Sequence, residues 1–474
     1  MTTALHDRTT AAPRAVRSGA VLAVLLLGQF MAILDVSIVN VAAPTLRTDL
    51  HASGAGLQLA IAGYTISYAV LLITGARLGD RIGHGRAFRA GLALFTAASL
   101  LCGLAPTTAT LIAFRVTQGV GAALMMPQVM SLIQRTFDGA ARARALSLYS
   151  AVIACGAVVG QVLGGVLVSA DMFGTGWRPV FLVNVPIGIA LLVFAKRILP
   201  ADRGEPGRAM DPLGVATLSS AVLLLVLPLV LGHEENWPAW CWAAMAASPV
   251  AFAAFVVVER RLAQRGGSPL VSGRVLRAPG LVVGAASLFV ALLNYGGFLF
   301  AFALHLQSGL GESALDAGLA FAPAAVGFAI TGLTWRYLPT RWHGPMIPAG
   351  LVVAAASYLL LAPILSGGGK GGTAMELDLF VLGLALGIAF SPMLTVALTH
   401  VPLPDAADAS GVLVTVFQLG QVVGVATLGT LYLSLVNSPG ATESAHAVSS
   451  TMVALAASAL AAAGFAFALV RSRR

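Results

Sequence analysis

Residues 21–43 read VLAVLLLGQFMAILDVSIVNVAA, and Asp35 is the only charged residue in this apolar run. A transmembrane helix needs about 20 predominantly apolar residues, a length that the run exceeds. Because the hydrocarbon core of a bilayer offers no partner to backbone N–H and C=O groups, such a run crosses it as a helix. The run therefore predicts a membrane-spanning helix that carries a carboxyl group inside the bilayer.

Thirteen similar runs follow, separated by charged residues or by Gly and Pro. Hydrophobic residues make up 58% of the 474 residues and charged residues 10%, and the mean hydropathy is +0.89. Soluble globular proteins carry about 25% charged residues, so the chain is predicted to be an all-α integral membrane protein. The fourteen predicted spans cover residues 21–43, 57–76, 87–105, 110–133, 145–170, 179–199, 212–231, 238–258, 280–306, 315–337, 345–365, 377–398, 409–436 and 448–470.

Positive charge follows this topology. With a cytoplasmic N-terminus, 24 of the 28 Lys and Arg residues fall in cytoplasmic segments, three fall in outer loops, and Arg115 lies within a span. This agrees with the positive-inside rule, and one missed span would reverse every later assignment. The sequence therefore predicts an even number of spans and two cytoplasmic termini, in the cell (plasma) membrane. It also excludes nucleic acid as the reason for the net charge of +9.

The chain contains an internal repeat with a spacing of about 260 residues. Residues 160–164 (GQVLG) match residues 420–424 (GQVVG), and residues 126–128 (MPQ) have a rough partner in residues 391–393 (SPM). Chance is the alternative explanation, because helices rich in Gly, Val and Leu resemble one another. Parallel halves related by an axis along the membrane normal are a transporter design, with a substrate site between them near the midplane.

The repeat divides the chain into three parts. We expect a six-helix N-terminal half (residues 1–200), a linker with two inserted spans (201–277) and a six-helix C-terminal half (278–474). This organisation implies that the chain interacts with the lipid bilayer and with a small-molecule substrate.

Four motifs carry a resemblance to a known family. They are LDVSIVNVAAP (34–44), GARLGDRIG (75–83), RVTQGVG (115–121) and GQVLGG (160–165). Together they resemble the major facilitator superfamily, specifically its 14-helix drug:proton antiporters, over almost the whole chain. The resemblance implies a major facilitator fold with fourteen helices arranged as 6 + 2 + 6 and pseudo-twofold halves.

The sequence departs from the family pattern at two places. His84 and Gly85 replace residues that are usually basic, which leaves Arg86 as the base of the loop motif. Gln161 replaces the Pro of the antiporter motif GPxxGG, so this motif alone does not establish antiport.

Two charged residues inside the spans are candidates for proton coupling. An ionised Asp at the bilayer centre costs about 2.5–3.5 kcal/mol on insertion scales, so Asp35 suits a site that gains and loses protons. Arg115 must face the bundle interior or a cavity, and the resemblance implies that it tunes a nearby carboxylate. The structural alternatives are a carboxylate capped by hydrogen bonds, for example to Asn40, and an Arg that binds backbone carbonyls.

The loop after the second span is the candidate gate. The resemblance implies that Asp80 and Arg81 form a latch between the halves that breaks when the transporter changes state. Charges at a helix end also have a plain electrostatic role. The residues assigned to the gating motif are Gly75, Asp80, Arg81, Gly83 and Arg86.

Glycine recurs at every fourth position of the fifth span from Gly156. Such a stripe lets helices pack closely, which is the simpler interpretation and is compatible with a role in sealing the outer side. Gln161 and its counterpart Gln421 are predicted either to hydrogen-bond across the two halves or to line the cavity. The residues assigned to the antiporter-motif helix are Gly160, Gln161, Gly164 and Gly165.

Polar, aromatic and Met side chains within the spans are candidates for lining the substrate cavity, because Met and aromatic side chains adapt to varied apolar ligands. Core packing is the alternative for each. The candidates are Gln29, Met31, Tyr64, Tyr68, Gln118, Met125, Met126, Asn294, Tyr295, Phe298, Phe417, Gln418 and Gln421. We expect His305 at the membrane interface, and Glu376 and Asp378 at the outer start of the twelfth span, where carboxylates are ordinary.

The sequence contains no nucleotide-binding GxxxxGK[ST] loop and no HExxH or GxSxG motif. An ion gradient must then drive transport, and no cofactor or metal is expected. The leading hypothesis is a monomeric secondary transporter, not an enzyme, that exports small amphipathic or cationic drugs or antibiotics in exchange for protons by alternating access.

Two alternatives remain at this point. The same fold could export or import an endogenous metabolite or lipid. A membrane receptor or scaffold would need a sizeable soluble domain, which the sequence does not predict. Arg-rich and Lys-poor usage favours a bacterial source with a GC-rich genome.

Overall fold

The computed structural model describes residues 11–170, 174–199, 202, 204, 211–232, 235–267, 269–270, 273–368, 371–398, 401, 406–436 and 440–471. Regular secondary structure in these residues is entirely helical. The helices up to residue 276 are α1 (Ala11–Asp49), α2 (Gly54–Ile82), α3 (His84–Gly103), α4 (Thr108–Thr136), α5 (Gly139–Ser169), α6 (Pro179–Leu182), α7 (Asn184–Ile198), α8 (Pro212–Leu231), α9 (Ala239–Gln264) and α10 (Gly273–Leu276). The later helices are α11 (Leu281–Leu304), η2 (His305–Gly309), α12 (Ala314–Ala320), α13 (Ala322–Thr334), η3 (Trp335–Tyr337), η4 (Thr340–Trp342), α14 (Met346–Ser366), α15 (Gly372–Leu398), α16 (Ala406–Gly424), η6 (Val425–Gly429), α17 (Thr430–Leu435) and α18 (Ala441–Arg471).

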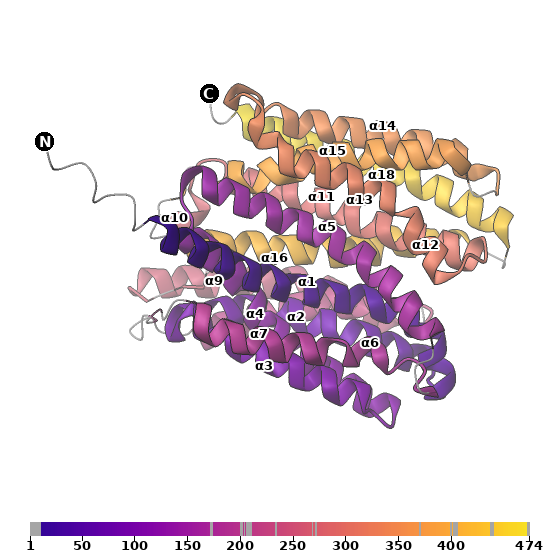
Figure 1. The fold of residues 1–474 in the computed structure, drawn as a ribbon, viewed down its shortest axis with the longest axis horizontal. Helices are drawn as coiled ribbons and strands as arrows, with labels where there is room; N and C mark the ends of the chain where they lie inside the picture. Colours follow the sequence, from indigo (N-terminus) through magenta and orange to yellow (C-terminus); the bar gives the residue numbers. More distant parts are fainter. Residues whose placement is uncertain are drawn as a thin grey trace, which may run out of the picture.

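The long helices run roughly parallel to one direction and form two groups. Helices from the first part of the chain, drawn in indigo and magenta, lie beside those from the last part, drawn in orange and yellow (Figure 1). The start of α1 and the end of α18 lie at the same end of the molecule (Figure 1). An even number of membrane crossings places the two ends of the chain on the same side of the membrane, as seen here.

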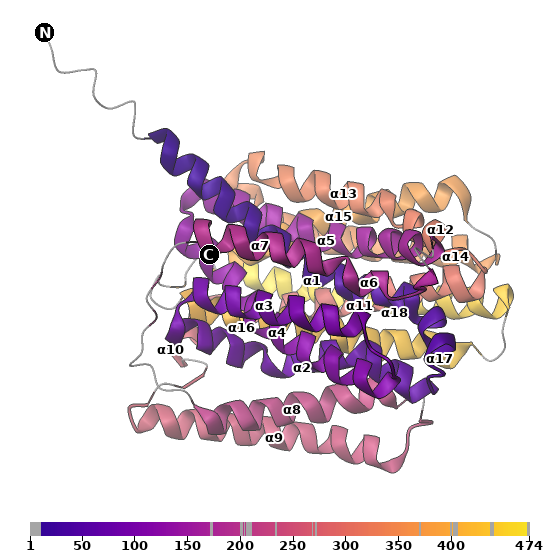
Figure 2. The same ribbon diagram turned by 60° about the horizontal axis from the view of Figure 1, so that its bottom comes forward.

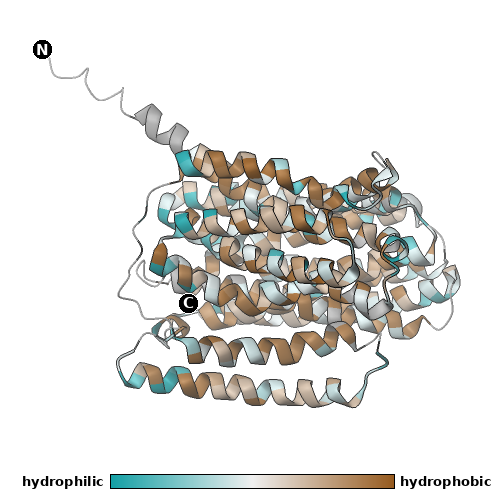
Figure 3. Cartoon of the chain, turned by 90° about the horizontal axis from the view of Figure 1, so that it is seen from below, coloured by the Kyte–Doolittle hydropathy of each residue, from teal (hydrophilic) through white to brown (hydrophobic). Residues whose placement is uncertain are grey.

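Apolar residues dominate the middle of the helices, and hydrophilic residues gather mainly toward their ends (Figure 3). Among the described residues, twelve helices are long and apolar enough to cross a membrane. The all-helical, membrane-spanning architecture is therefore confirmed. The 20-residue α3 and the 31-residue α5 are not among the twelve, so the count of fourteen spans stays a prediction.

Helices α8 and α9 lie against each other at one side of the bundle (Figure 2). The Ser248 hydroxyl of α9 donates to the Ala221 carbonyl of α8 at 2.8 Å. The Ser219 hydroxyl of α8 donates to the Val70 carbonyl of α2 at 3.1 Å. The pair is thus attached to the outside of the first group, where an inserted pair is expected.

The repeated glycine motif packs in the same way in both parts of the chain. A Cβ atom on Gly160 of α5 would lie 2.9 Å from the Leu34 carbonyl oxygen of α1. A Cβ atom on Gly420 of α16 would lie 2.7 Å from the Phe289 carbonyl oxygen of α11. Because only glycine permits such close backbone approach, each motif joins its helix to the first long helix of its half.

Candidate functional site

Asp35 lies at the centre of a buried hydrogen-bond network in the first group of helices. Its side chain is fully buried. One carboxylate oxygen, Oδ2, accepts from Arg115 of α4 at 2.5 Å. The other oxygen, Oδ1, accepts from the Gln118 amide at 2.8 Å and from the Asn184 amide of α7 at 2.9 Å. The carboxylate thus joins α1, α4 and α7 through three donors.

Arg115 is held by acceptors from two further groups. Its Nε donates to the Ala60 carbonyl of α2 at 3.0 Å, and its Nη1 also donates to Gln118 Oε1 at 2.7 Å. The guanidinium lies 4.7 Å from the centre of the Tyr64 ring and 5.6 Å from that of Phe181. Aromatic faces attract a cation that has left water. The two rings therefore stabilise the Arg115 charge in addition to the Asp35 carboxylate.

Both partners of the Asp35–Arg115 ion pair are hydrogen-bonded, so loss of either charge would disturb the pair. A buried pair is stable when hydrogen bonds satisfy both partners, and removal of one partner costs about 3–5 kcal/mol because the other charge stays buried. A proton on Asp35 removes its negative charge in the same way. A neutral Asp35 would leave the buried Arg115 charge without its carboxylate partner.

Helix α5 supports the back of α1 at the level of this network. A Cβ atom on Gly156 would lie 3.0 Å from Ile33, and one on Gly164 would lie 3.1 Å from the Ile38 carbonyl oxygen. The packing interpretation of the glycine stripe is what the structure shows. Gln161 lies on an uninterrupted helix, and its Oε1 has no hydrogen-bond partner among the described residues.

The gating motif lies where α2 meets α3. Gly83, with a φ of +96°, ends α2 and begins α3. The carboxylate of Asp80 approaches Arg77 Nη1 at 4.0 Å and His84 Nε2 at 3.6 Å. Arg77 donates to the Pro269 and Leu270 carbonyls, between α9 and α10. The motif thus contacts the segment that leads into the second half.

The remaining residues of the motif have separate positions. Gly75 permits the close crossing of α2 over α4, because a Cβ there would clash with the Ala123 backbone. Arg81 and Arg86 are exposed.

His84, one of the two departures from the family pattern, is buried in this cluster. Its Nδ1 lies 2.7 Å from Gln128 Oε1, while the amide nitrogen of Gln128 donates to the Gly75 and Leu124 carbonyls. Nδ1 therefore carries a proton, and Nε2 faces Asp80. Burial lowers the pKa of His84 from its usual 6.5, and Arg135 lowers it further, against the opposing effects of the Gln128 hydrogen bond and the Asp80 and Asp202 charges.

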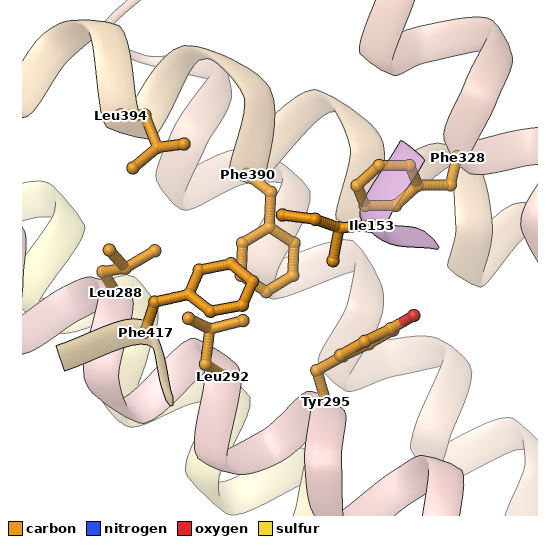
Figure 4. Close-up of a pocket in the computed structure, with 8 residues that line it drawn as sticks. All are labelled: Ile153, Leu288, Leu292, Tyr295, Phe328, Phe390, Leu394 and Phe417. Atoms are coloured by element: carbon orange, nitrogen blue, oxygen red, sulfur yellow. The ribbon is translucent and has the colours of Figure 1, made fainter. Parts of the chain in front are cut away.

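A small apolar cavity lies between the two groups of helices (Figure 4). Figure 4 shows the side chains of Ile153, Phe390 and Phe417 pointing toward one another. The open space is about 20 Å³, room for little more than one water molecule. A drug-sized ligand needs roughly 300–1,000 Å³, so this state is closed around its centre. The lining residues are Ile153, Leu288, Leu292, Tyr295, Phe328, Phe390, Leu394 and Phe417.

Contacts between the halves flank the cavity along α5. The Trp335 indole of η3 donates to the Ser147 hydroxyl at 3.0 Å. Toward the other end of α5, a Cβ on Gly318 of α12 would lie 3.0 Å from Val162 Cγ2. Fifteen helical residues separate the two contacts, or about 22 Å, and Ile153 lies between them. The halves are thus in contact on both sides of the cavity.

Comparison with known proteins places this architecture in a family. The sequence pattern described as "Major Facilitator Superfamily" matches residues 25–425. The chain belongs to the major facilitator superfamily. Members of this family are transporters and not enzymes, and this protein is accordingly a multi-pass membrane transporter.

Similar major facilitator proteins include antibiotic exporters. The chain is 40% identical over 437 residues to a protein of Streptomyces coelicolor described as a probable actinorhodin transporter, covering 91% of this chain and 75% of that protein. It is 37% identical over 415 residues to a cephamycin export protein of Amycolatopsis lactamdurans, covering 85% and 82%. The crystal structure of the human organic anion transporter MFSD10 is similar in fold, with a TM-score of 0.65 at 14% identity over 95% of this chain and 99% of that one.

The predicted cavity residues of this major facilitator protein differ in their surroundings. Tyr295 and Phe417 line the cavity. Gln421 is partly buried, with its backbone against Gly296, and the Gln418 side chain lies outside the described residues. The others are buried in the packed core around the cavity: Gln29, Met31, Tyr64, Tyr68, Gln118, Met125, Met126, Asn294 and Phe298.

The sequence did not indicate several residues of the network and cavity. Asn184 binds Asp35 directly, and Ser99 accepts from Gln118 at 2.8 Å. An Asn inside the sixth apolar run was the available signal for the first. The six other lining residues could not be recognised from the sequence, because they are apolar and apolar residues also fill the rest of the core.

The structure adds to one further expectation and corrects another. His305 is fully buried within the protein, and its Nδ1 lies 2.7 Å from the Ser444 hydroxyl, while its location at the membrane interface stays a prediction. Asp378 is 6% exposed within α15, which begins six residues earlier, at Gly372. The added helical turn places this carboxyl inside the bundle, whereas Glu376 remains exposed.

Proposed function

We propose that this protein exports small amphipathic or cationic antibiotics in exchange for protons, by alternating access of its two halves. Residues 1–200 and 278–474 act as the moving halves, residues 201–277 link them, and both termini lie in the cytoplasm. The exporters among the relatives support the direction and the class of substrate. The proton gradient supplies the energy to a monomer.

The observation that carries proton coupling is the buried Asp35–Arg115 pair. In the proposed cycle, a proton from the outer side binds the Asp35 carboxylate and neutralises it. Arg115 stays with the Ala60 carbonyl and the Tyr64 ring, and α1 loses its charged tie to α4. Since α1 packs on α5, and α5 carries contacts to the second half, the change reaches the interface between the halves.

The closed cavity supports alternating access around a central site. A cavity of about 20 Å³ cannot hold an antibiotic, so substrate enters only when one of the flanking contacts opens. Aromatic and aliphatic side chains suit the apolar part of an amphipathic molecule. None of the eight lining residues is acidic, which favours the amphipathic class over the cationic class.

Replacement of Asp35 tests the coupling. In proteoliposomes with an imposed pH gradient, we expect Asp35→Asn to lower gradient-driven efflux of a fluorescent amphipathic drug at least tenfold. Substrate counterflow, which needs no proton gradient, is expected to persist because Asn keeps a side-chain oxygen for Gln118 or Asn184.

The matched control is Asp49→Asn, at the end of the same helix, where the carboxylate binds Trp177 and Arg178 at the surface. We expect it to retain gradient-driven efflux. Wild-type pH-driven efflux by folded Asp35→Asn would remove Asp35 from proton coupling.

A further inference from the structure

We propose that Asp378 is a second proton-binding group of this transporter, located in the C-terminal half. The inference rests on the proposed antiport function and concerns its proton stoichiometry. In each cycle, one proton from the outer water forms an O–H bond with the Asp378 carboxylate. The same bond breaks toward the inner water, so the group alternates between charges of −1 and 0.

The position of Asp378 separates it from ordinary carboxylates at helix starts. It is the seventh residue of α15, a 27-residue helix that is apolar enough to cross a membrane. The side chain is 6% exposed, whereas Glu376, two residues earlier, is exposed to solvent. An acidic side chain buried within a span is a functional-site candidate by default, because its ionised form is costly there.

The partners of Asp378 differ from those of Asp35. Asp378 receives a hydrogen bond from Ser357 of α14, and its Oδ2 has no hydrogen-bond partner among the described residues. No Lys or Arg of the described chain forms an ion pair with it. Asp35, in contrast, has three donors and the Arg115 charge. Asp378 is therefore a buried carboxyl with an oxygen available to a proton and no cation to replace it.

Two tyrosines of the described residues lie near Asp378. Tyr358 follows Ser357 on α14 and is influenced electrostatically by both Asp378 and Tyr295 of α11. The Tyr358 hydroxyl donates to Asn294 Oδ1 at 2.7 Å. A change of proton occupancy at Asp378 changes the charge of this region by a full unit.

Hydrogen-bonded side chains also join α14, beside Asp378, to the cavity-lining helix α11. Asn294, which accepts from Tyr358, donates to the Leu455 carbonyl at 2.6 Å and to Ser458 at 2.8 Å. Its neighbour on α11, Tyr295, lines the cavity and lies 6.2 Å from Phe390 between ring centres. Proton binding at Asp378 can therefore alter the packing of α11, α14 and α15 around the substrate.

The test is a stoichiometry measurement on the full chain in proteoliposomes. The pH gradient at which net drug flux reverses is measured at several drug gradients, which yields the number of protons exchanged per drug molecule. We expect Asp378→Asn to exchange one proton fewer than wild type. We expect Glu376→Gln, the exposed acid of the same helix, to match wild type.

A second readout reports protonation without transport. Infrared difference spectra of purified protein between acidic and alkaline buffer contain the carbonyl stretch of each carboxyl that protonates. We expect one buried-carboxyl band to be absent from Asp378→Asn and shifted in Asp378→Glu, which keeps a carboxyl and therefore the wild-type stoichiometry.

The outcomes separate the two proposals. Wild-type stoichiometry and an unchanged infrared band in Asp378→Asn would overturn the second site and leave antiport intact. If wild-type protein shows no pH-driven flux, the antiport function fails and this inference fails with it. If Asp378→Asn does not fold, a wild-type band that does not shift in Asp378→Glu overturns the proposal.

Discussion

At the scale of single residues, the buried side chains of Asp35 and His84 differ in how many of their polar atoms have hydrogen-bond partners. Asp35 accepts hydrogen bonds from three donors, one of which is the charged Arg115. His84 has one satisfied nitrogen, and its second nitrogen faces Asp80 at 3.6 Å. At a position where the family pattern usually has a basic residue, this chain therefore has a histidine, whose charge depends on pH.

The pH dependence of stability follows from His84. Burial lowers its pKa below the 6.5 of an exposed histidine, so the unfolded chain binds the proton first as the pH falls. The stability contribution is complete above about pH 6.5 and decreases below it, down to the lowered pKa of the folded state. We expect the thermal midpoint in detergent to fall more between pH 7 and pH 5 (approximate limits of this window) for wild type than for His84→Gln.

The control for the loss of a histidine is His446→Gln, at an exposed position, which should keep the wild-type dependence. Equal pH dependence of His84→Gln and wild type would show that this histidine does not titrate differently on unfolding.

At the scale of helices, α5 is the element that contacts both α1, beside Asp35, and the helices from the last part of the chain. One face carries glycines that approach the α1 backbone around Asp35, and Val162 and Ser147 contact the second half. Gln161 takes the place of a proline, and α5 continues without interruption. Close helix packing, and not a proline kink, therefore sets the position of α5 against α1.

A methyl group on this face tests the packing. A Cβ on Gly160 would lie 2.8 Å from Ser37 Cβ and 2.9 Å from the Leu34 carbonyl oxygen, so α1 must shift. Overpacking of this kind costs about 1–3 kcal/mol. We expect Gly160→Ala to lower thermal stability and drug efflux together, while Gly464→Ala on α18, where no atom lies within 4 Å of the added methyl, retains both. Wild-type values for Gly160→Ala would contradict the close approach.

At the scale of the whole molecule, the halves touch on both sides of a cavity that is too small for a drug. The Ser147–Trp335 and Val162–Gly318 contacts lie about 22 Å apart along α5. A transporter in this state must break one of them to bind or release substrate. In the proposed cycle, this conformation would correspond to an occluded intermediate.

A disulfide across the second contact tests this view. A Cβ on Gly318 would lie 3.5 Å from Val162 Cα and 3.0 Å from Val162 Cγ2, so cysteine side chains at these two positions would meet across the contact. We expect the double variant Val162→Cys/Gly318→Cys to cross-link under mild oxidation and to lose most of its drug efflux, with recovery after reduction. The single variants serve as controls. Full efflux by the cross-linked protein would show that this contact need not open.

Much of the fold was predictable because hydrophobicity is a local property. A run such as residues 21–43 must cross a bilayer as a helix whatever its neighbours are, so the helical positions and the all-α class followed from composition. The division into two halves and an inserted pair stays a prediction from the repeat. The Asp35 and Arg115 candidates were recognisable because charge inside an apolar run is costly and rare.

The partners of these residues were decided by tertiary structure alone. Asn184 binds Asp35 across 149 residues of sequence, and nothing in either run specifies that meeting. The burial of Asp378 and His305 depends on where α15 and η2 begin and on which helices cover them. Apolar runs predict that helices enter the bilayer, but only long-range packing selects which polar side chains face one another there, because hydrogen bonds and cavities form between helices and not within them.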